Sequence, residues 1–361
     1  MARVDLKKIV REELAHLQAV KVESVFPEDY VRLNMNENFF VEPDVMEKII
    51  SEACREFDCR KYPENLAGEA VRAISHFLKV DESRVFVGNG LDQVMDILFR
   101  TYVGNGDKVI VVEPTFGLYS YFTKICGGNV ETVLLNPDFS LNVKKIIETA
   151  KDGVSLVIFC SPNNPTGNQF PKEDLEKVLE VEALVVLDEA YVHFADYSLV
   201  DEVENYDNLI VMRTFSKSFG LAGIRCGYLV STSEVVDYMK RITHPFHMSQ
   251  LTQIIVSKAL RASSYFEERA RMVIEERERL QRVLGGIGGI KVYPSKANFI
   301  LLKIVKEGLT SRIVGERLKE RKVLVRDVSD KPLLSNCIRV TVGVPEQNKY
   351  FVSALIESLE I

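Results

Sequence analysis

The sequence predicts an α/β protein: a large domain with a mostly parallel central sheet flanked by helices, plus a smaller α+β domain. From about residue 84 to 231, short apolar runs rich in β-branched residues alternate with helical patterns. Strands this uniformly apolar are buried on both faces, which is typical of a parallel sheet covered by helices. Beyond about residue 232 this alternation stops. We expect the large domain to span residues 40–245 and the small domain to combine residues 1–39 and 246–361.

Each predicted strand of the large domain is followed by a helix or by a polar loop. The helical segments carry apolar residues at three- and four-residue spacing. The strands are "RVFVG", "KVIVVE", "SLVIFCS", "ALVVLDEAY", "NLIVMRT" and "CGYLVS", and the helices among them are "LDQVMDILFRTYV", "FGLYSYFTKIC" and "KEDLEKVLE".

The small domain has a different pattern. Two helical stretches, "QLTQIIVSKALRA" and "YFEERARMVIEERERLQRVL", lead through "GGIGG" into the strands "NFILLKI", "KVLVRD" and "CIRVTVG", and a helix ends at Ile361. The N-terminal "MARVDLKKIVREELAHL" predicts an amphipathic helix and lacks the apolar run of a signal peptide.

Composition disfavours several classes of function. The net charge is -6 and the pI is about 5.6, with basic and acidic residues interleaved, so we expect no nucleic-acid partner. No run of about 18 uninterrupted apolar residues could span a membrane. His244 and His247 are spaced like metal ligands, but a proline lies between them and no acid or thiol partner is evident, so we expect no metal site. The cysteines form no CxxC pair, and four of the six sit in apolar runs, which favours free thiols in a reducing cytoplasm.

Polar residues follow five of the predicted strands directly. After the strands come "GNGLDQ", "EPTFGLY", "SPNNPTG", "DEAY" and "RTFSKS". In an open parallel sheet, ligands bind at the carboxyl ends of the strands, so we expect these segments to converge on one crevice.

The "GNGLDQ" loop, residues 88–93, follows a strand and opens a helix. Free backbone N–H groups and the positive end of a helix dipole favour an anion there. A dinucleotide fingerprint would need a third glycine where Gln93 stands. The loop therefore suits a single phosphate better than a pyrophosphate, which weakens a dehydrogenase interpretation.

The other strand ends supply an acid, a phenol, an amide and a lysine. Asp188 ends an apolar strand, and a carboxylate at that depth is costly unless it meets a cation or a protonated nitrogen. Tyr191 follows three residues later, and Asn164 lies in the turn "SPNNPTG". Lys217 follows "NLIVMRT", where a buried amine must be neutralised, paired or chemically used. Together with the phosphate loop, these groups are the partners that pyridoxal phosphate needs.

Three motifs, "SPNNPTG", "LDEAY" and "RTFSKSFGLAGIRCGY", resemble in order and spacing those of the fold-type I aminotransferases, and in detail the histidinol-phosphate aminotransferase branch. Matches at "LNMNEN", "KYPEN", "PTFGLY", "PSKANFILL" and "CIRVTVG" extend the resemblance over nearly the whole chain. It implies a cytoplasmic homodimer that depends on pyridoxal 5'-phosphate. The implied reaction is histidinol phosphate plus 2-oxoglutarate to imidazole acetol phosphate plus glutamate, in histidine biosynthesis.

The resemblance also assigns roles around the cofactor ring. Lys217 would bind the cofactor aldehyde and carry protons, and Asp188 would keep the pyridine nitrogen protonated. Asn164 and Tyr191 would hydrogen-bond the ring oxygen, and Phe116 would stack on the ring. Lys217, Asp188 and Tyr191 are thus the expected catalytic residues.

The expected phosphate site combines three segments of this chain with one residue of a second copy. Its members are Ser216, Arg225, the backbone of Gly90, Leu91 and Asp92, and Tyr62 of the partner subunit. The last assignment implies composite active sites in a homodimer.

On the substrate side, the resemblance assigns Arg339 to an α-carboxylate, Arg326 to a distal phosphate or γ-carboxylate, and Asn36 to the substrate. We expect the two cations at opposite ends of the site. Val20 stands where the branch usually has a tyrosine near the substrate phosphate. Two alternative activities therefore stay open, an aromatic amino acid aminotransferase and a threonine-phosphate decarboxylase. A non-catalytic, cofactor-binding regulator is disfavoured, because it normally needs a DNA-binding module.

Overall fold

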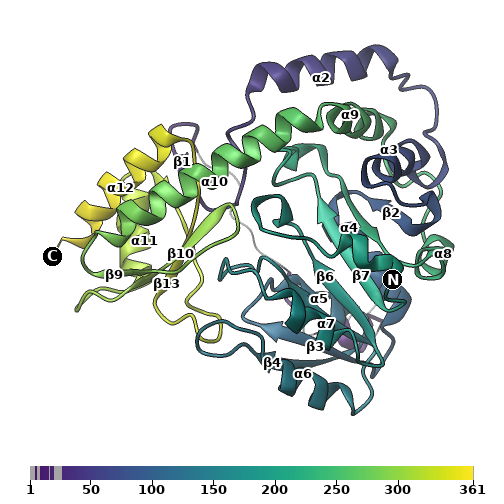
Figure 1. Ribbon diagram of the computed structural model, residues 1–361, viewed down its shortest axis with the longest axis horizontal. Helices are drawn as coiled ribbons and strands as arrows, with labels where there is room; N and C mark the ends of the chain where they lie inside the picture. The colour runs from purple at the N-terminus through teal and green to yellow at the C-terminus, as the bar shows by residue number, and fades with distance from the viewer. Residues whose placement is uncertain (1–4, 6–8, 16, 20–26, 361) are drawn as a thin grey trace.

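The computed structural model describes residues 5, 9–15, 17–19 and 27–360. Figure 1 shows two parts side by side. The larger part holds the central sheet with its helices, and the smaller part holds the C-terminal helices and strands together with β1.

Within these described residues, seven strands form the central sheet in the order β2-β8-β7-β6-β5-β3-β4. Its neighbours pair in parallel except at β8, which is antiparallel to both β2 and β7. The predicted mostly parallel sheet is thereby confirmed. The strands are β2 (Val85–Gly88), β3 (Lys108–Glu113), β4 (Asn129–Leu134), β5 (Leu156–Cys160), β6 (Leu184–Asp188), β7 (Leu209–Thr214) and β8 (Gly227–Val230).

Helices cover both faces of this sheet. Residues that alternate along β3 show this directly, since Val109 and Val111 belong to one apolar cluster while Ile110 and Val112 belong to the other. The helices are α2 (Pro43–Glu56), α3 (Gly68–Leu78), α4 (Gly90–Tyr102), α5 (Leu118–Ile125), α6 (Val143–Ala150), α7 (Lys172–Val178), α8 (Ser233–Arg241) and α9 (Gln250–Arg261). Short 3-10 turns connect them at η2 (Asn65–Ala67), η3 (Glu82–Arg84), η4 (Val192–Phe194), η5 (Val200–Glu204) and η6 (Ala222–Ile224).

The smaller part packs α10 (Ser263–Gly285), α11 (Ser311–Glu320) and α12 (Pro345–Leu359) around an antiparallel sheet of order β12-β13-β10-β9. These strands are β9 (Ile290–Val292), β10 (Phe299–Ile304), β12 (Arg326–Asp327) and β13 (Cys337–Thr341). A separate parallel pair joins β1 (Val31–Arg32) to β11 (Val323–Leu324).

Two sequence-based expectations differ from the structure. "KVLVRD" is not one strand, because β11 pairs with β1 while β12 pairs with β13 in the other sheet. The N-terminal helix is shorter where it is described: α1 covers Glu12–Ala15, and residues 9–11 form a turn. Ile9 is 68% exposed there, so its side chain is not buried as an apolar residue of an amphipathic helix would be.

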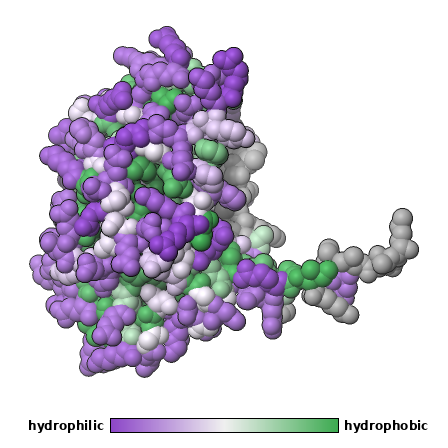
Figure 2. Space-filling view, turned by 90° about the vertical axis from the view of Figure 1, so that its right-hand side faces the viewer, coloured by the Kyte–Doolittle hydropathy of each residue, from purple (hydrophilic) through white to green (hydrophobic). Residues whose placement is uncertain are grey.

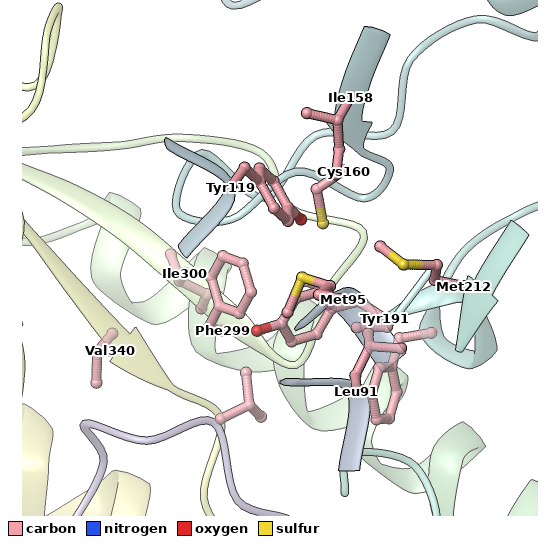
Figure 3. Packing of buried hydrophobic residues seen from close by; sticks show 14 of the residues in the cluster. Leu91, Met95, Tyr119, Ile158, Cys160, Tyr191, Met212, Phe299, Ile300 and Val340 are labelled. Carbon is pink, nitrogen blue, oxygen red and sulfur yellow. The ribbon is translucent and has the colours of Figure 1, made fainter. Parts of the chain in front are cut away.

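The apolar core on one face of the sheet continues into the smaller part. Figure 3 shows Tyr191 from the large domain beside Phe299 of β10, and their rings meet edge to face with centroids 5.1 Å apart.

The side of the molecule near α3 and α8 is mostly hydrophilic, with scattered hydrophobic areas (Figure 2). No helix in the described part of the chain is both long enough and apolar enough to cross a membrane.

Candidate active site at the carboxyl ends of the strands

The carboxyl ends of β2, β3, β5, β6 and β7 meet at one edge of the central sheet, because these five strands run in the same direction. Residues 34–38 of the small-domain side lie at this edge. Their backbone accepts hydrogen bonds from Arg339 at Asn34 and from Lys217 at Met35, at 2.7 and 2.9 Å. The site therefore forms between the two parts of the molecule.

Asp188 ends β6 as a buried carboxylate, 3% exposed, with no ion-pair partner among the described residues. Its Oδ2 accepts a hydrogen bond from the Tyr119 hydroxyl at 2.6 Å, and its Oδ1 accepts one from the Ala190 backbone N–H at 2.9 Å. Burial raises the pKa of Asp188 to about 6. An unpaired carboxylate at this depth fits a ligand that brings a protonated nitrogen.

Lys217 lies just beyond β7 with its amine 5.9 Å from the centroid of the Tyr191 ring. Burial, assisted by the positive charge of Arg339, lowers the pKa of the Lys217 amine to about 8. An amine with this pKa is neutral in a useful fraction near pH 7, as nucleophilic and proton-transfer roles require. The Tyr191 hydroxyl accepts a hydrogen bond from Asn36 Nδ2 at 3.0 Å, and burial raises the pKa of that phenol.

An anion cradle forms where α4 begins. Gly90 has a φ of +76°, and a Cβ at this position would lie 2.3 Å from Arg225 Nη2. A Cβ at Gly227 would lie 2.4 Å from the Leu91 backbone nitrogen. The positive φ favours glycine at position 90, and the close approach of backbone requires it at position 227. The start of β8, the Arg225 guanidinium and the first turn of α4 therefore lie close together. Arg225 also donates to Asp92 Oδ2 at 3.2 Å.

Ser216 belongs to the same cradle. Thr214 is paired with Gly227 across β7 and β8 and donates from its hydroxyl to Ser216 Oγ at 3.0 Å. The structure therefore gathers a hydroxyl, a guanidinium and the N-terminus of a helix, a combination of donors that suits phosphate.

Arg339 lies on the opposite wall, formed by the small domain. Its Nη1 donates to Asn164 Oδ1 at 2.6 Å, and its guanidinium carbon lies 5.3 Å from the centroid of the Phe299 ring. Burial lowers the pKa of Arg339 to about 10. Arg326 is its direct cross-strand partner in β12 and β13. The expectation that the two cations lie at opposite ends is wrong, because residues paired in this way point to the same side of a sheet.

Buried polar atoms that have no hydrogen-bond partner among the described residues gather on this wall. A buried donor or acceptor left unpaired costs about 1–3 kcal/mol, so each is a place where a polar ligand would stabilise the protein. Those near residues 34–38 and Arg339 are Asn34 Oδ1, Glu37 Oε2, Asn298 Oδ1 and Arg339 Nε. Together with Asp188, Lys217 and the anion cradle, this donor and acceptor set fits pyridoxal phosphate with a polar substrate.

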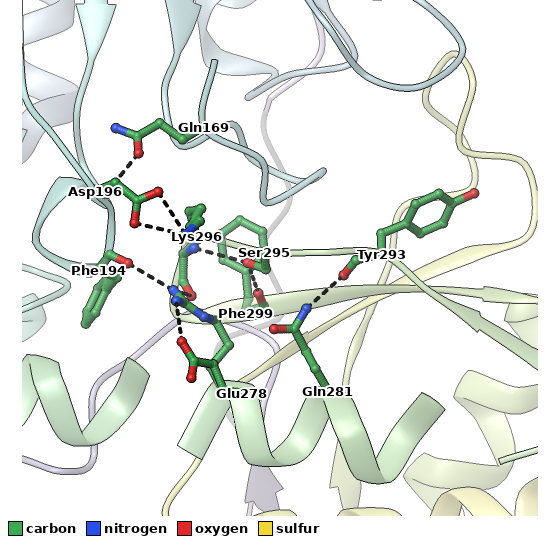
Figure 4. A network of polar contacts seen from close by, with 11 residues as sticks. Gln169, Phe194, Asp196, Glu278, Gln281, Tyr293, Ser295, Lys296 and Phe299 are labelled. Atoms are coloured by element: carbon green, nitrogen blue, oxygen red, sulfur yellow. Dashed lines mark hydrogen bonds and ion pairs between the residues drawn. The ribbon is translucent and has the colours of Figure 1, made fainter. Parts of the chain in front are cut away.

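Polar contacts tie the two parts of the molecule together beside the site, as Figure 4 shows. Lys296, just before β10, pairs with Asp196 of the large domain at 2.8 Å. The Arg277 guanidinium, buried on α10, donates to the backbone oxygens of Phe194 and Ala297 at 2.9 and 3.2 Å. These contacts fix the spacing of the two walls.

Two predicted site residues lie nearer the margin of this arrangement. Phe116 is half-buried with its ring edge-on to Tyr119, their centroids 5.7 Å apart. Tyr62 is 82% exposed and stacks on Phe246 at 4.8 Å, and no contact in the described part of the chain connects it to the cradle. Val20 lies outside the described residues.

Sequence reasoning missed Tyr119 and Asn298, which orient predicted residues, and it expected a different contact for Asn36. Tyr119, the hydrogen-bond partner of Asp188, stands three residues after Phe116 in "PTFGLY", and that spacing on a helix could have found it. Asn36, expected on the substrate, uses its side chain on Tyr191 and on Thr341, whose hydroxyl donates to Asn36 Oδ1 at 3.2 Å. Asn298 donates to the Asn36 backbone oxygen at 3.0 Å, a contact that no local pattern indicates.

Comparisons with known proteins agree with this geometry. The family model "Aminotransferase class I and II" matches residues 28–355. Histidinol-phosphate aminotransferase of Caldanaerobacter subterraneus subsp. tengcongensis is 36% identical over 98% of this chain and 99% of its own length. The enzyme of the same name from Thermococcus gammatolerans is 40% identical over 91% of each chain. The crystal structure of histidinol-phosphate aminotransferase from Sinorhizobium meliloti in complex with pyridoxal-5'-phosphate has a TM-score of 0.83 and 25% identity, covering 91% of this chain and 90% of that one.

Proposed function

The chain belongs to the class I and II aminotransferases and is a pyridoxal-phosphate-dependent enzyme, and from this premise we propose that it transfers the amino group of histidinol phosphate to 2-oxoglutarate. The products would be imidazole acetol phosphate and glutamate, as a step of histidine biosynthesis. The names of the curated relatives support this substrate assignment.

The observation that carries the proposal is the cross-strand pair of Arg326 and Arg339. Two like charges directly opposite each other destabilise a sheet, and the charge of Arg326 lowers the pKa of Arg339. An anion on this side of the sheet removes the repulsion. Phosphate, with up to two charges and three acceptor oxygens, matches two guanidinium groups better than a single carboxylate does. An aromatic amino acid donor offers only the carboxylate.

The chain's own residues would hold the cofactor from all sides. Lys217 would hold its aldehyde carbon, the Asp188 carboxylate its ring nitrogen, and Ser216, Arg225 and the first turn of α4 its phosphate. Tyr191 and Asn164 would face the ring oxygen, and Phe116 one face of the ring. Their convergence at one edge of the sheet supports these assignments.

The bound cofactor supplies an electron-withdrawing ring that accepts the electron pair left when a proton leaves the carbon bearing the amino group. The Asp188 carboxylate favours the protonated ring nitrogen on which that capacity depends. The Lys217 amine, with its pKa lowered to about 8, would take up the proton that leaves this carbon and would later release it. Asn36 fixes the orientation of the Tyr191 hydroxyl, and Asn164 accepts a hydrogen bond from Arg339.

A donor panel tests the substrate assignment. The purified enzyme is supplied with histidinol phosphate, phenylalanine, tyrosine and threonine phosphate, each with 2-oxoglutarate, and kcat/KM and CO2 release are measured. We expect histidinol phosphate to give the highest kcat/KM and no donor to release CO2. Release of CO2 from threonine phosphate would favour the decarboxylase instead.

The matching variant is Arg326→Ala, with Arg312→Ala on the outer surface of α11 as the control. Losing one charge-assisted hydrogen bond, about 1.5–3 kcal/mol, lowers kcat/KM for the phosphorylated donor by about 10- to 100-fold. Aromatic donors should be affected far less. A preference for aromatic donors, with Arg326→Ala harmless to them, would assign the enzyme to the aromatic aminotransferases.

We further infer a cytoplasmic homodimer with composite active sites. The exposed, mutually stacked rings of Tyr62 and Phe246 support this, because large aromatic rings at the surface are typical of interfaces. We also propose the domain division expected from the sequence, 40–245 against 1–39 and 246–361, with one change after residue 245. The packing of α9 against α2 and α3 favours assigning residues 250–261 to the large domain as well.

A further inference from the structure

A second cavity lies behind the loop that carries Lys217, outside the set of residues assigned to the cofactor and substrate. Its volume is about 220 Å³. It is lined from α3, η4, the Lys217 loop and α10 by Phe77, His193, Ser218, Phe219, Phe266, Glu267, Ala270 and Arg271. The cavity is smaller than the roughly 300–1,000 Å³ of pockets for drug-sized ligands, so it suits a molecule with a single ring.

The interior of this cavity is aromatic. The rings of Phe219 and Phe266 are tilted against each other with centroids 4.8 Å apart, and the His193 ring meets Phe219 edge to face at 5.7 Å. Phe77 adds a third phenyl ring to the wall. Ring faces and edges arranged in this way favour a flat aromatic guest.

Two polar groups in the wall have no protein partner in the described part of the chain. The Ser218 hydroxyl oxygen is buried in a residue that is 2% exposed, and nothing hydrogen-bonds to it. His193 makes a ring contact with Phe219 but no hydrogen bond through either ring nitrogen. Burial lowers the pKa of His193 to about 3, so the imidazole is neutral and offers one donor and one acceptor. The Ser218 hydroxyl oxygen lies beneath the cavity surface, whereas the His193 imidazole lines the cavity, so a guest with a polar ring substituent would satisfy the imidazole.

The mouth of the cavity carries one acid and one base. Glu267 and Arg271 stand four residues apart on α10 and are exposed, a spacing at which such residues commonly pair. Here neither residue takes part in an ion pair or hydrogen bond within the described chain, although other charges on the helix do, for example Arg279 with Glu276 at 2.7 Å. The two opposite charges are therefore free to bind the two ends of a zwitterion.

We propose that this cavity is a second binding site, for a ring-bearing α-amino acid. The ring would lie among Phe77, Phe219 and Phe266, with its polar substituent toward the His193 imidazole. The carboxylate would bind Arg271, and the ammonium group would bind Glu267. The site is independent of the substrate assignment, and its occupant contacts Ser218, the residue next to Lys217. Because the Ser218 backbone oxygen accepts a hydrogen bond from Asn38 at 2.9 Å, the same loop also contacts the segment 34–38 of the active site.

The chain contains no tryptophan, which allows a reporter specific to this cavity. Phe77→Trp is introduced in the cofactor-loaded protein, and indole emission is followed while α-methyl-L-tyrosine is added. This probe has the ring, hydroxyl, ammonium and carboxylate groups that the site requires, but it has no α-hydrogen and so cannot be transaminated. Excitation at a wavelength where the phenol does not absorb restricts the signal to the reporter. We expect a saturable change in emission.

Two charge variants in the reporter background identify the contacts. Arg271→Gln and Glu267→Gln should each weaken binding by about 10- to 100-fold, the loss of one charge-assisted hydrogen bond. Arg282→Gln is the matched control, since Arg282 is exposed on the same helix and outside the cavity. The decarboxylated probe, α-methyltyramine, should bind the parent reporter protein as weakly as the full probe binds Arg271→Gln.

Calorimetry of the wild-type chain with the same probe guards against a reporter variant that fails to fold. The proposal is supported if calorimetry detects binding to the wild-type chain, and if Arg271→Gln weakens this binding while Arg282→Gln does not. Equal affinity in these two variants would show that Arg271 does not hold the carboxylate, and a probe that changes only the cofactor absorption would lie in the active site. Either result would overturn the proposal.

Discussion

Replacing Asp188 by asparagine should stabilise the cofactor-free protein at neutral pH. The carboxylate is buried without a cation, and its pKa is raised from 3.8 to about 6 by burial. A raised pKa in the folded state means that the protonated form is favoured by folding. The associated stability is therefore present below about pH 4 and is lost as the pH rises through about 6. The amide of the asparagine variant has no charge to bury and should not show this loss.

The size of the effect follows from the shift. A rise of the Asp188 pKa from 3.8 to about 6 corresponds to about 3 kcal/mol of stability at a pH where the carboxylate is fully ionised in both the folded and the unfolded protein. By linkage, ionisation of Asp188 lowers the free energy of unfolding of the wild type by about 1 kcal/mol at pH 4.5 and by about 3 kcal/mol at pH 7. The free energy of unfolding of Asp188→Asn minus that of the wild type should therefore rise by about 2 kcal/mol between these pH values. Taking the difference cancels the titration of all groups that the two proteins share.

The assay is urea unfolding of the two cofactor-free proteins across this range of pH, followed by circular dichroism. Asp152→Asn is the control, since Asp152 is exposed before β5 and its carboxylate makes no ion pair within the described residues. In the cofactor-bound proteins the order should reverse, because a protonated ring nitrogen is a cation partner for Asp188 and not for an amide. A difference between the cofactor-free proteins that stays flat with pH would show that Asp188 is not the strained acid that the structure indicates.

Three further predictions concern the same site. Lys217→Ala should remove the absorption band of the imine between Lys217 and the cofactor aldehyde and should reduce turnover to background; a wild-type protein that stays colourless after incubation with pyridoxal phosphate and removal of the excess would contradict the cofactor assignment. Mixing inactive Lys217→Ala with inactive Tyr62→Ala chains should recover part of the activity, because some dimers then contain one intact composite site; no recovery, or full cofactor affinity in Tyr62→Ala alone, would argue against a shared site. Tyr119→Phe removes a hydrogen bond that lowers the pKa of Asp188, so the loss of cofactor affinity on acidification should begin at a higher pH than in the wild type. Binding titrations at a series of pH values would measure this; an unchanged pH dependence would mean that the hydrogen bond does not influence cofactor binding.

The sequence predicted the fold class and the cofactor well because both depend on features that local pattern reveals. Uniformly apolar runs predict strands buried on both faces, and the polar residues just after them are brought together whenever the strands run parallel. Asp188 and Lys217 could therefore be chosen from their places after β6 and β7. Their roles toward the cofactor remain predictions, supported by the geometry.

Such reasoning could not predict contacts between segments that belong to different strands of a sheet. Arg326 and Arg339 are thirteen residues apart by their numbers, and only the register of β12 on β13 shows that they face the same side. "KVLVRD" has the composition of a single strand, yet its two halves bond to different sheets because β1 offers a separate edge to Val323 and Leu324. Pairing partners are a tertiary property, which periodicity along one segment does not encode.

The buried charges of the site share one physical explanation. Burial displaces the pKa of Asp188 upward to about 6, and those of Lys217 and Arg339 downward to about 8 and 10. Each shift marks a charge that the empty protein stabilises poorly, and each has a complement in the ligands proposed here: a ring nitrogen, an aldehyde and a substrate anion. Binding would remove these penalties together, so it should stabilise the fold while it assembles the site. An enzyme that keeps such groups buried is less stable without its cofactor and substrate, but its charges are already in position when these ligands bind.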